Sequence, residues 1–201
     1  MAILSHFPKV SRVSRQRTLR GVPLPIALVL TIAAGSSPAW AAMPPLDEYT
    51  VKAAFLVNFT EFVEWPAGSF QSAYDPIAIC VLGQDPFGHS LEDRVARRAI
   101  EGRPLLVRHV SSVRQGAGCH VLFISSAENK RSSPVLAELK APGVLTIGES
   151  DDSAIEGVVI NFKLQGGKVR FEINQAAADR EKLRISSRLL SLALIVDPAR
   201  K

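Results

Sequence analysis

The sequence predicts an α/β fold, a single layered domain whose mixed, mainly parallel sheet carries an antiparallel hairpin and is flanked by helices. Two observations lead to this prediction. Short apolar runs alternate with helix-like segments through the first two thirds of the chain after residue 41, as in sheets whose parallel strands are joined by crossover helices. Two further runs then flank a Gly-Gly turn, which indicates a hairpin.

The first expected element is a helix over residues 47–64. It should end at Trp65-Pro66, because the residue before a proline is displaced from helical geometry. Its apolar residues recur at helical spacing and define one face. That face is formed by Val51, Phe55, Phe59 and Phe62.

The remaining elements follow in chain order. Strands are expected at 77–82, 104–110, 119–124 and 144–147, and helices at 91–100 and 133–140. The hairpin should join 158–164 to 168–173. Asn174 should cap a helix over 176–182, and Ser186 or Ser187 should cap a final helix over 188–196.

Residues 1–41 have the organisation of a secretory signal peptide. Five basic residues and no acid precede an apolar run over 26–34, and Ala39-Trp40-Ala41 gives a small-residue cleavage pattern. The run is too short to span a bilayer, which needs about 20 apolar residues. We therefore expect export, cleavage near Ala41 and a mature domain over 42–201, with an uncleaved membrane anchor as the alternative.

The formal charge of +5 does not describe the expected mature chain. Five of the 24 lysines and arginines lie before residue 41 and all 19 acids lie after it, so the mature chain carries equal numbers of both charges. Binding to nucleic acid needs a clustered basic surface, and binding to an anionic membrane needs a polybasic patch. Neither is therefore an expected partner.

The sequence contains two cysteines, Cys80 and Cys119. In an oxidising compartment such a pair usually forms a disulfide, which we expect here, with two buried free thiols as the alternative. The C-x-x-C spacing of redox-active motifs is absent, so no oxidoreductase role is expected.

The segment 83–90 follows an expected strand and precedes an expected helix, as a phosphate-binding loop does. Gly83 and Gly88 have the spacing of that motif, but His89 stands where its lysine would be and Asp85 adds a negative charge. A loop that only turns the chain is the preferred interpretation. Because α/β folds bind small molecules at the carboxyl ends of strands, Gly83, Gly88 and His89 are kept as a candidate ligand loop.

A catalytic constellation is not recognised in the sequence. Segment 148–152 carries the first glycine and the serine of a nucleophile elbow but lacks its second glycine, and its acidic residues favour a surface turn. His89, His109 and His120 lack the spacing of a helical metal pair. We therefore expect no enzyme, no metal and no cofactor.

Glu172 and Arg170 are the candidates for contact with another protein. They lie on the second arm of the hairpin, where Phe171 and Ile173 are expected to face the core while Glu172 and Arg170 face outward. An exposed strand face of this kind can bind a partner; an ordinary surface carboxylate at Glu172 is the alternative.

Several strings occur in order along the chain: YTVKAAFLVNF (49–59), WP (65–66), ICVLG (79–83), GRP (102–104), CHVLFIS (119–125), VRFEIN (169–174) and ISSRLL (185–190). Together they resemble the YfiR/HmsC-like family of periplasmic regulators, over nearly all of the expected mature chain.

The resemblance implies a non-catalytic domain that represses an inner-membrane diguanylate cyclase by binding its periplasmic portion, and so controls cyclic di-GMP and biofilm formation. Cys80 and Cys119 match the family's long-range disulfide. The second disulfide that some members carry near the hairpin has no counterpart here, so a switch based on it is not expected. Other membrane sensor proteins, an outer-membrane lipoprotein and a second copy of the chain are the further partners considered.

Two other functions are weighed against this one. A periplasmic sensor or carrier would hold a small molecule at the loop over 83–90. A hydrolase has the least support, because the sequence does not supply a recognisable nucleophile, base and orienting acid.

Overall fold

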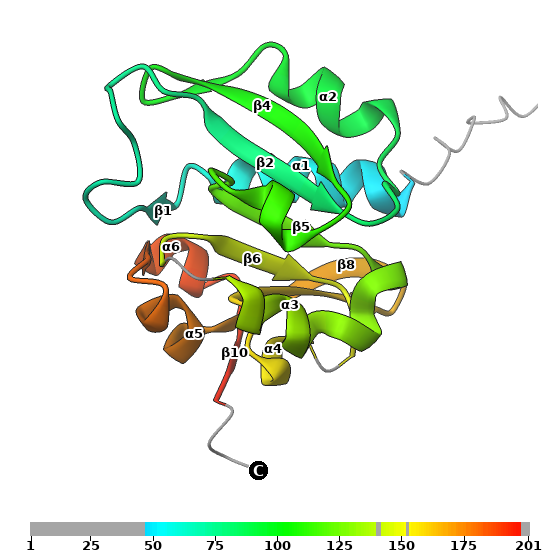
Figure 1. Ribbon diagram of the computed structural model, residues 1–201. Helices are drawn as coiled ribbons and strands as arrows, with labels where there is room; N and C mark the ends of the chain where they lie inside the picture. The colour runs from blue at the N-terminus through cyan, green and yellow to red at the C-terminus, as the bar shows by residue number, and fades with distance from the viewer. Residues whose placement is uncertain (1–46, 140–141, 152, 198–201) are drawn as a thin grey trace, which may run out of the picture. The chain divides into compact units, whose positions relative to one another are not determined.

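An eight-stranded sheet organises the residues that the computed structural model describes, which are 47–139, 142–151 and 153–197 (Figure 1). The strand order is β10-β8-β7-β6-β5-β2-β4-β3. The expected signal peptide and its cleavage point near Ala41 lie outside the described residues.

The strands of this sheet are β2 (Ile77–Leu82), β3 (Ala99–Ile100), β4 (Arg103–Val110), β5 (Val121–Ile124), β6 (Leu145–Gly148), β7 (Ile160–Gln165), β8 (Lys168–Asn174) and β10 (Leu194–Val196). Separately, β1 (Val63–Glu64) and β9 (Arg184–Ile185) pair antiparallel. The helices are α1 (Glu48–Phe59), α2 (His89–Val95), α3 (Ser132–Glu138), α4 (Ser153–Glu156), α5 (Gln175–Arg180) and α6 (Ser187–Leu190), with 3-10 turns η1 (Val113–Gly116) and η2 (Ser126–Arg131).

The central strands run parallel in the order β4-β2-β5-β6-β7, and β7 returns antiparallel as β8. Numbered along the chain, the parallel strands have the order 2-1-3-4-5, which is that of flavodoxin-like doubly wound sheets. At the edges, β10 pairs parallel with β8 and β3 antiparallel with β4. The predicted α/β fold, with its mainly parallel sheet and antiparallel hairpin, is confirmed.

Alternate residues of β2 enter two separate cores. Ile77, Ile79 and Val81 pack on the face that α1 and α2 cover. Cys80 and Leu82 pack on the opposite face, with apolar residues of η1 and α3. A strand that is covered on both faces is apolar throughout, which is why this run is recognisable in the sequence.

The first helix ends at Phe59, earlier than expected. The predicted continuation to residue 64 is wrong, because Val63 leaves the helix to pair with Ile185 of β9. The buried face also differs from the predicted one, since Val51 and Phe55 are only half-buried. The fully buried apolar residues of α1 are Ala53, Leu56, Val57 and Phe59.

The hairpin forms as predicted. Gly166 and Gly167 have φ values of 56° and 71° and make the two-residue turn between the paired residues Gln165 and Lys168, a geometry that glycine adopts without strain. Asn174 then caps α5, as its side chain accepts a hydrogen bond from the backbone N–H of Ala177 at 2.9 Å.

The expected final helix is wrong beyond Leu190. Ser186 caps α6, and its hydroxyl accepts a hydrogen bond from the backbone N–H of Leu189. Residues Leu194–Val196 instead form β10, which pairs with the outer edge of β8. This pairing satisfies backbone groups of β8 that a longer helix would leave without a strand partner.

Candidate functional site

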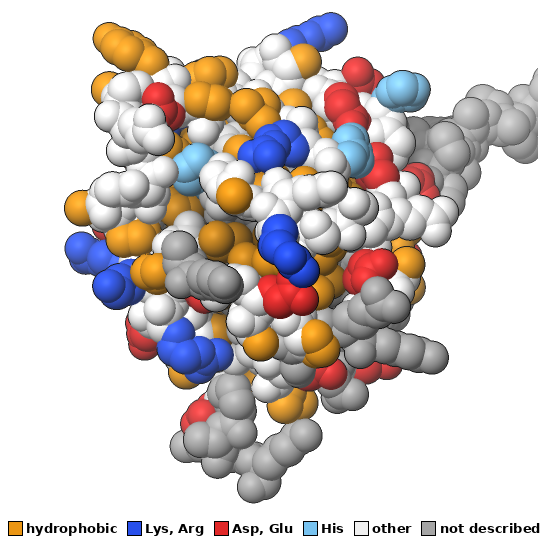
Figure 2. Space-filling model, in the orientation of Figure 1, with side chains coloured by type: hydrophobic (Ala, Val, Ile, Leu, Met, Phe, Trp, Pro, Cys, Tyr) orange, Lys and Arg blue, Asp and Glu red, His pale blue; other side chains and the backbone are white. Residues whose placement is uncertain are grey.

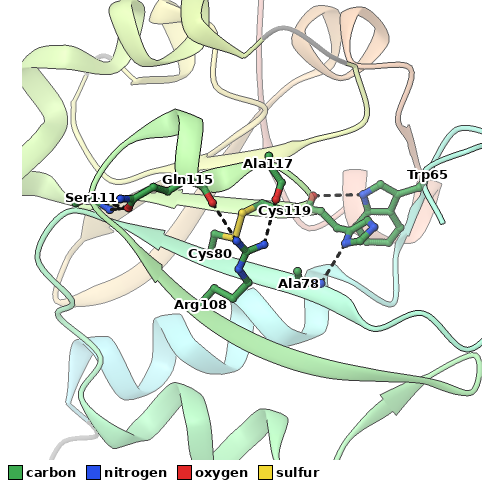
Figure 3. Close-up of a disulfide and its surroundings, with 9 residues drawn as sticks. Trp65, Ala78, Cys80, Arg108, Ser111, Gln115, Ala117 and Cys119 are labelled. Carbon is green, nitrogen blue, oxygen red and sulfur yellow. Dashed lines mark hydrogen bonds between the residues drawn. A yellow bond between two sulfur atoms is a disulfide. The ribbon is translucent and has the colours of Figure 1, made fainter. Parts of the chain in front are cut away.

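A disulfide joins Cys80 to Cys119 in the core on the α3 side of the sheet (Figure 3). Both cysteines are buried and their Cα atoms lie 5.9 Å apart, a typical separation for such a bond. The pairing agrees with the one expected from the sequence. It ties β2, at the centre of the sheet, to the loop that leads into its neighbour β5.

Arg108 braces the loop that carries Cys119. Its guanidinium donates hydrogen bonds to the carbonyl oxygens of Gln115 and Ala117 at 3.0 and 3.1 Å, as Figure 3 shows. Arg108 pairs with Cys80 in the register between β4 and β2, so both side chains lie on the same face. The sulfur bridge and the guanidinium therefore hold the same loop, which makes the disulfide a structural brace.

His120, next to the disulfide, is a buried structural histidine. Its Nδ1 accepts a hydrogen bond from the backbone N–H of Ala78 at 3.1 Å, and its Nε2 lies 3.0 Å from the carbonyl oxygen of Ser69. These two partners require a neutral ring with the proton on Nε2. The ring also stacks on Phe70 with centroids 4.3 Å apart. Burial lowers the pKa of His120.

The candidate ligand loop begins at Gly83, where neighbouring side chains leave little space for a ligand. Gly83 follows β2 and has φ +86°, and a Cβ placed on it would meet Cγ of Glu128 at 2.6 Å and Oγ of Ser125 at 2.9 Å. In doubly wound sheets this point beside β5 is where ligands bind, but here side chains from the turn after β5 occupy the space next to Gly83. Gly88 and His89 are exposed at the start of α2.

Lys52 and Glu149 form a buried ion pair that the sequence did not predict. Nζ of Lys52 lies 2.7 Å from Oε2 of Glu149, and the two side chains are 6% and 2% exposed. Burial disfavours the ammonium, but its hydrogen bonds to Glu149 and Glu48 outweigh this effect and raise the pKa of Lys52. The expected acidic surface turn is therefore wrong at Glu149. The one signal in the sequence was a lysine within the apolar stretch of α1.

Glu172 and Arg170 lie on β8 and alternate with Phe171 and Ile173. The side chains of Phe171 and Ile173 are buried in the core, as predicted. Arg170 is exposed. Glu172 is half-buried, and one of its carboxylate oxygens accepts a hydrogen bond from Nδ2 of Asn161 at 3.2 Å. The carboxylate is thus fixed on the surface by its neighbour on β7.

Exposed apolar side chains border Glu172. Leu194 pairs with Glu172 in the register between β10 and β8 and is 53% exposed, so the two side chains share a face of the sheet. Ile195, which pairs with Ile173, points to the opposite face and is 50% exposed, and Leu192 just before the strand is 70% exposed. Since β10 ends the strand order, its outer edge has no strand partner within the described part of the chain. Exposed apolar side chains along an unpaired strand edge are a feature of surfaces that bind other proteins. We refer to Arg170, Glu172, Leu192, Leu194 and Ile195 as the β8–β10 edge.

Residues 49–194 match the model of the YfiR/HmsC-like family. The chain belongs to this family. The YfiR/HmsC-like family is periplasmic and regulatory and is not a family of enzymes, which supports a role for this member as a periplasmic regulator. Among residues 47–139, 142–151 and 153–197, no helix has the length and hydropathy needed to cross a membrane.

Other comparisons add little to the assignment to the YfiR/HmsC-like family. No curated protein matches the chain. A solved structure that resembles it is the crystal structure of a conserved domain protein from Vibrio cholerae O1 biovar El Tor strain N16961, with a TM-score of 0.49 and 12% identity. The similarity covers 76% of this chain and 61% of that one, so this chain spans about three fifths of that protein's length.

Proposed function

We propose that this YfiR/HmsC-like protein represses an inner-membrane diguanylate cyclase by binding its periplasmic portion, and so lowers cyclic di-GMP and biofilm formation. The observation that carries the proposal is the family match over residues 49–194. The signal peptide expected over residues 1–41 would deliver the domain to the compartment where such a portion lies.

The β8–β10 edge provides the contact in this proposal. Leu192, Leu194 and Ile195 supply apolar area, and its removal from water favours association. The charges of Glu172 and Arg170 would select a complementary partner surface and fix its orientation. The outer edge of β10 can also pair with an extended segment of the partner through backbone hydrogen bonds.

Repression follows if the domain binds the inactive state of the cyclase more tightly than the active state. Binding then shifts the population of the enzyme without any chemistry in the periplasm. Moving such an equilibrium from about 99% active to about 99% inactive requires a differential affinity of about 5.5 kcal/mol.

Repression of the cyclase is tested by deleting the gene and then complementing the deletion. The deletion should raise intracellular cyclic di-GMP, and the unaltered gene should restore the low level. A double variant, Leu194→Asp with Ile195→Asp, should fail to restore it although the protein is exported in equal amount. Tyr74→Asp is the matched control, because Tyr74 is 81% exposed but lies outside the β8–β10 edge. Unchanged cyclic di-GMP in the deletion strain under every growth condition would refute the cyclase as target.

The alternative of a small-molecule sensor at the loop over 83–90 has weaker support. Ser125 and Glu128 occupy the space beside Gly83 where a ligand would enter. Native mass spectrometry of the exported protein tests this alternative, since a retained organic ligand would favour it.

A further inference from the structure

Three potential metal ligands meet at a place that the proposed function does not use. Asp85 lies in the loop after β2, Glu92 on α2 and His109 near the end of β4, and one ligand atom of each lies within 4.8 Å of the others. Figure 2 shows histidine and acidic side chains gathered over α2 and the end of β4, at the upper right. We propose that Asp85, Glu92 and His109 form a binding site for a divalent transition-metal ion, with Zn²⁺ as the preferred ion.

The distances between the ligand atoms suit this ion. Nε2 of His109 lies 3.1 Å from Oδ2 of Asp85 and 3.5 Å from Oε1 of Glu92. Around tetrahedral zinc with ligands at about 2.0 Å, neighbouring ligand atoms are about 3.3 Å apart. These two distances are close to that value, and the two carboxylate oxygens lie within 4.8 Å of each other, so the side chains can close around the ion by moving together. A water molecule can take the fourth position, because the His109 side chain is 49% exposed.

The ligands are positioned by the fold. His109 shares a face of β4 with Leu105 and Val107, which pack into the core that α2 helps to cover, so its ring meets Glu92 of that helix. Oδ1 of Asp85 accepts a hydrogen bond from the backbone N–H of Phe87 at 2.8 Å. This contact leaves Oδ2 of Asp85 directed at His109, as an outer-shell hydrogen bond orients a metal-binding carboxylate.

One oxygen of the cluster has no partner in the protein. The Glu92 side chain is 39% exposed as a whole, but its Oε2 is buried and has no hydrogen-bond partner among the described residues, although buried polar atoms normally have one. A cation held by the carboxylate of Glu92 would compensate this oxygen. The cluster also lies at the carboxyl ends of β2 and β4, the edge at which α/β sheets bind ligands.

The donor set selects the kind of ion. One imidazole nitrogen with two carboxylates suits zinc and its transition-metal neighbours, whereas Mg²⁺ and Ca²⁺ are bound through oxygen ligands. The competing account is an ordinary ion pair, in which a protonated His109 bridges Asp85 and Glu92 and no metal binds.

Zinc titration of the untagged protein, expressed from the full gene, separates the two accounts. Competition with a chromogenic chelator should reveal one Zn²⁺ per chain. His109→Gln should weaken binding at least about 100-fold, and Glu92→Gln and Asp85→Asn at least about 10-fold. Asp85→Asn keeps an oxygen for the N–H of Phe87, so it serves as the second variant if His109→Gln does not fold. Asp93→Asn is the matched control, because this exposed carboxylate on α2 lies outside the cluster.

The expected result is a single site that is lost in the cluster variants and unchanged in Asp93→Asn, with circular dichroism showing that each variant is folded. Absence of stoichiometric Zn²⁺ in the unaltered protein overturns the proposal. Equal Zn²⁺ affinity in His109→Gln, Asp85→Asn and the unaltered protein also overturns it. Displacement of Zn²⁺ by an equal concentration of Mg²⁺ would overturn the assignment of the ion.

Discussion

The ammonium group of Lys52 lies 2.7 Å from the carboxylate of Glu149, and both side chains are almost completely buried. The pair joins α1 to the turn after β6 across 97 residues of sequence. The backbone N–H of Ser126 donates to the other carboxylate oxygen at 2.7 Å, so the negative charge is compensated from two sides.

Lys52→Met should lower the free energy of unfolding by about 3–5 kcal/mol, because Glu149 is left as a buried charge without its counter-ion. Urea denaturation followed by circular dichroism measures this loss. The double variant Lys52→Met with Glu149→Gln should be more stable than Lys52→Met alone, since it leaves no uncompensated charge. A single variant as stable as the unaltered protein would contradict the role of the pair.

Replacement of Cys80 and Cys119 by serine should lower the free energy of unfolding by about 4 kcal/mol. The bond closes a loop with a sequence separation of 39, and its removal frees the unfolded chain by roughly that amount in the chain-entropy model. Reductant should destabilise the unaltered protein to a similar degree and leave the serine variant unchanged. Two titratable thiols in the native exported protein would be incompatible with this expectation.

His120 should make stability decline as the pH falls below about 6.5. Burial lowers the pKa of the folded ring from its ordinary value of 6.5, and the positive charge of Arg103 lowers it further. The hydrogen bond to Ser69 and the negative charge of Asp75 act in the opposite direction but do not outweigh burial. The unfolded state therefore binds more protons than the folded state in this range. The stability from the neutral ring is fully present above pH 6.5, and it is lost progressively as the pH falls from 6.5 through the lower pKa of the folded ring.

The measurement for His120 is the urea midpoint between pH 7.5 and pH 5. His120→Gln should be less stable at neutral pH, because it loses the hydrogen bond from Ala78, but it should lose less stability on acidification. His89→Gln is the control, because this ring is exposed at the start of α2. Parallel pH curves for His120→Gln and the unaltered protein would rule out this origin.

Asn174→Ala should cost about 2–4 kcal/mol of stability. Its oxygen caps α5, a contact of about 1 kcal/mol, and its Nδ2 donates to the carbonyl oxygen of Ala154 at 2.8 Å in a buried position. Loss of that donor adds about 1–3 kcal/mol. Ser186→Ala, which removes only the cap of α6, should cost about 1 kcal/mol. Thermal and urea unfolding of the two variants compare them directly, and equal losses would contradict the buried contact.

Secondary structure could be predicted from the sequence where the residues of a segment themselves indicate its conformation and burial. Residues 77–82 are covered on both faces and therefore apolar throughout, and Gly166-Gly167 suits a two-residue turn. The chain around Val63 and the strand over 194–196 could not be predicted, because their conformation depends on partners far away in the sequence.

The candidate sites also differ in whether the local sequence could predict them. The pairing of Cys80 with Cys119 follows from the count of cysteines and the expected compartment. Glu149 was expected on the surface, because nothing in its own segment indicates the lysine that reaches it from α1. Asp85, Glu92 and His109 have no regular spacing in the sequence, and the register of β2 with β4 is needed to bring them together.

The aromatic contacts of α1 tie the start of the described chain to the hairpin. Phe55 and Phe59 meet Phe162 and Phe171 of the hairpin, with ring centroids 5.0 to 6.2 Å apart. A chain that ends at β6 lacks Phe162 and Phe171, so the rings of α1 are without these aromatic partners. The core on this face of the sheet is therefore complete only when the hairpin has been added.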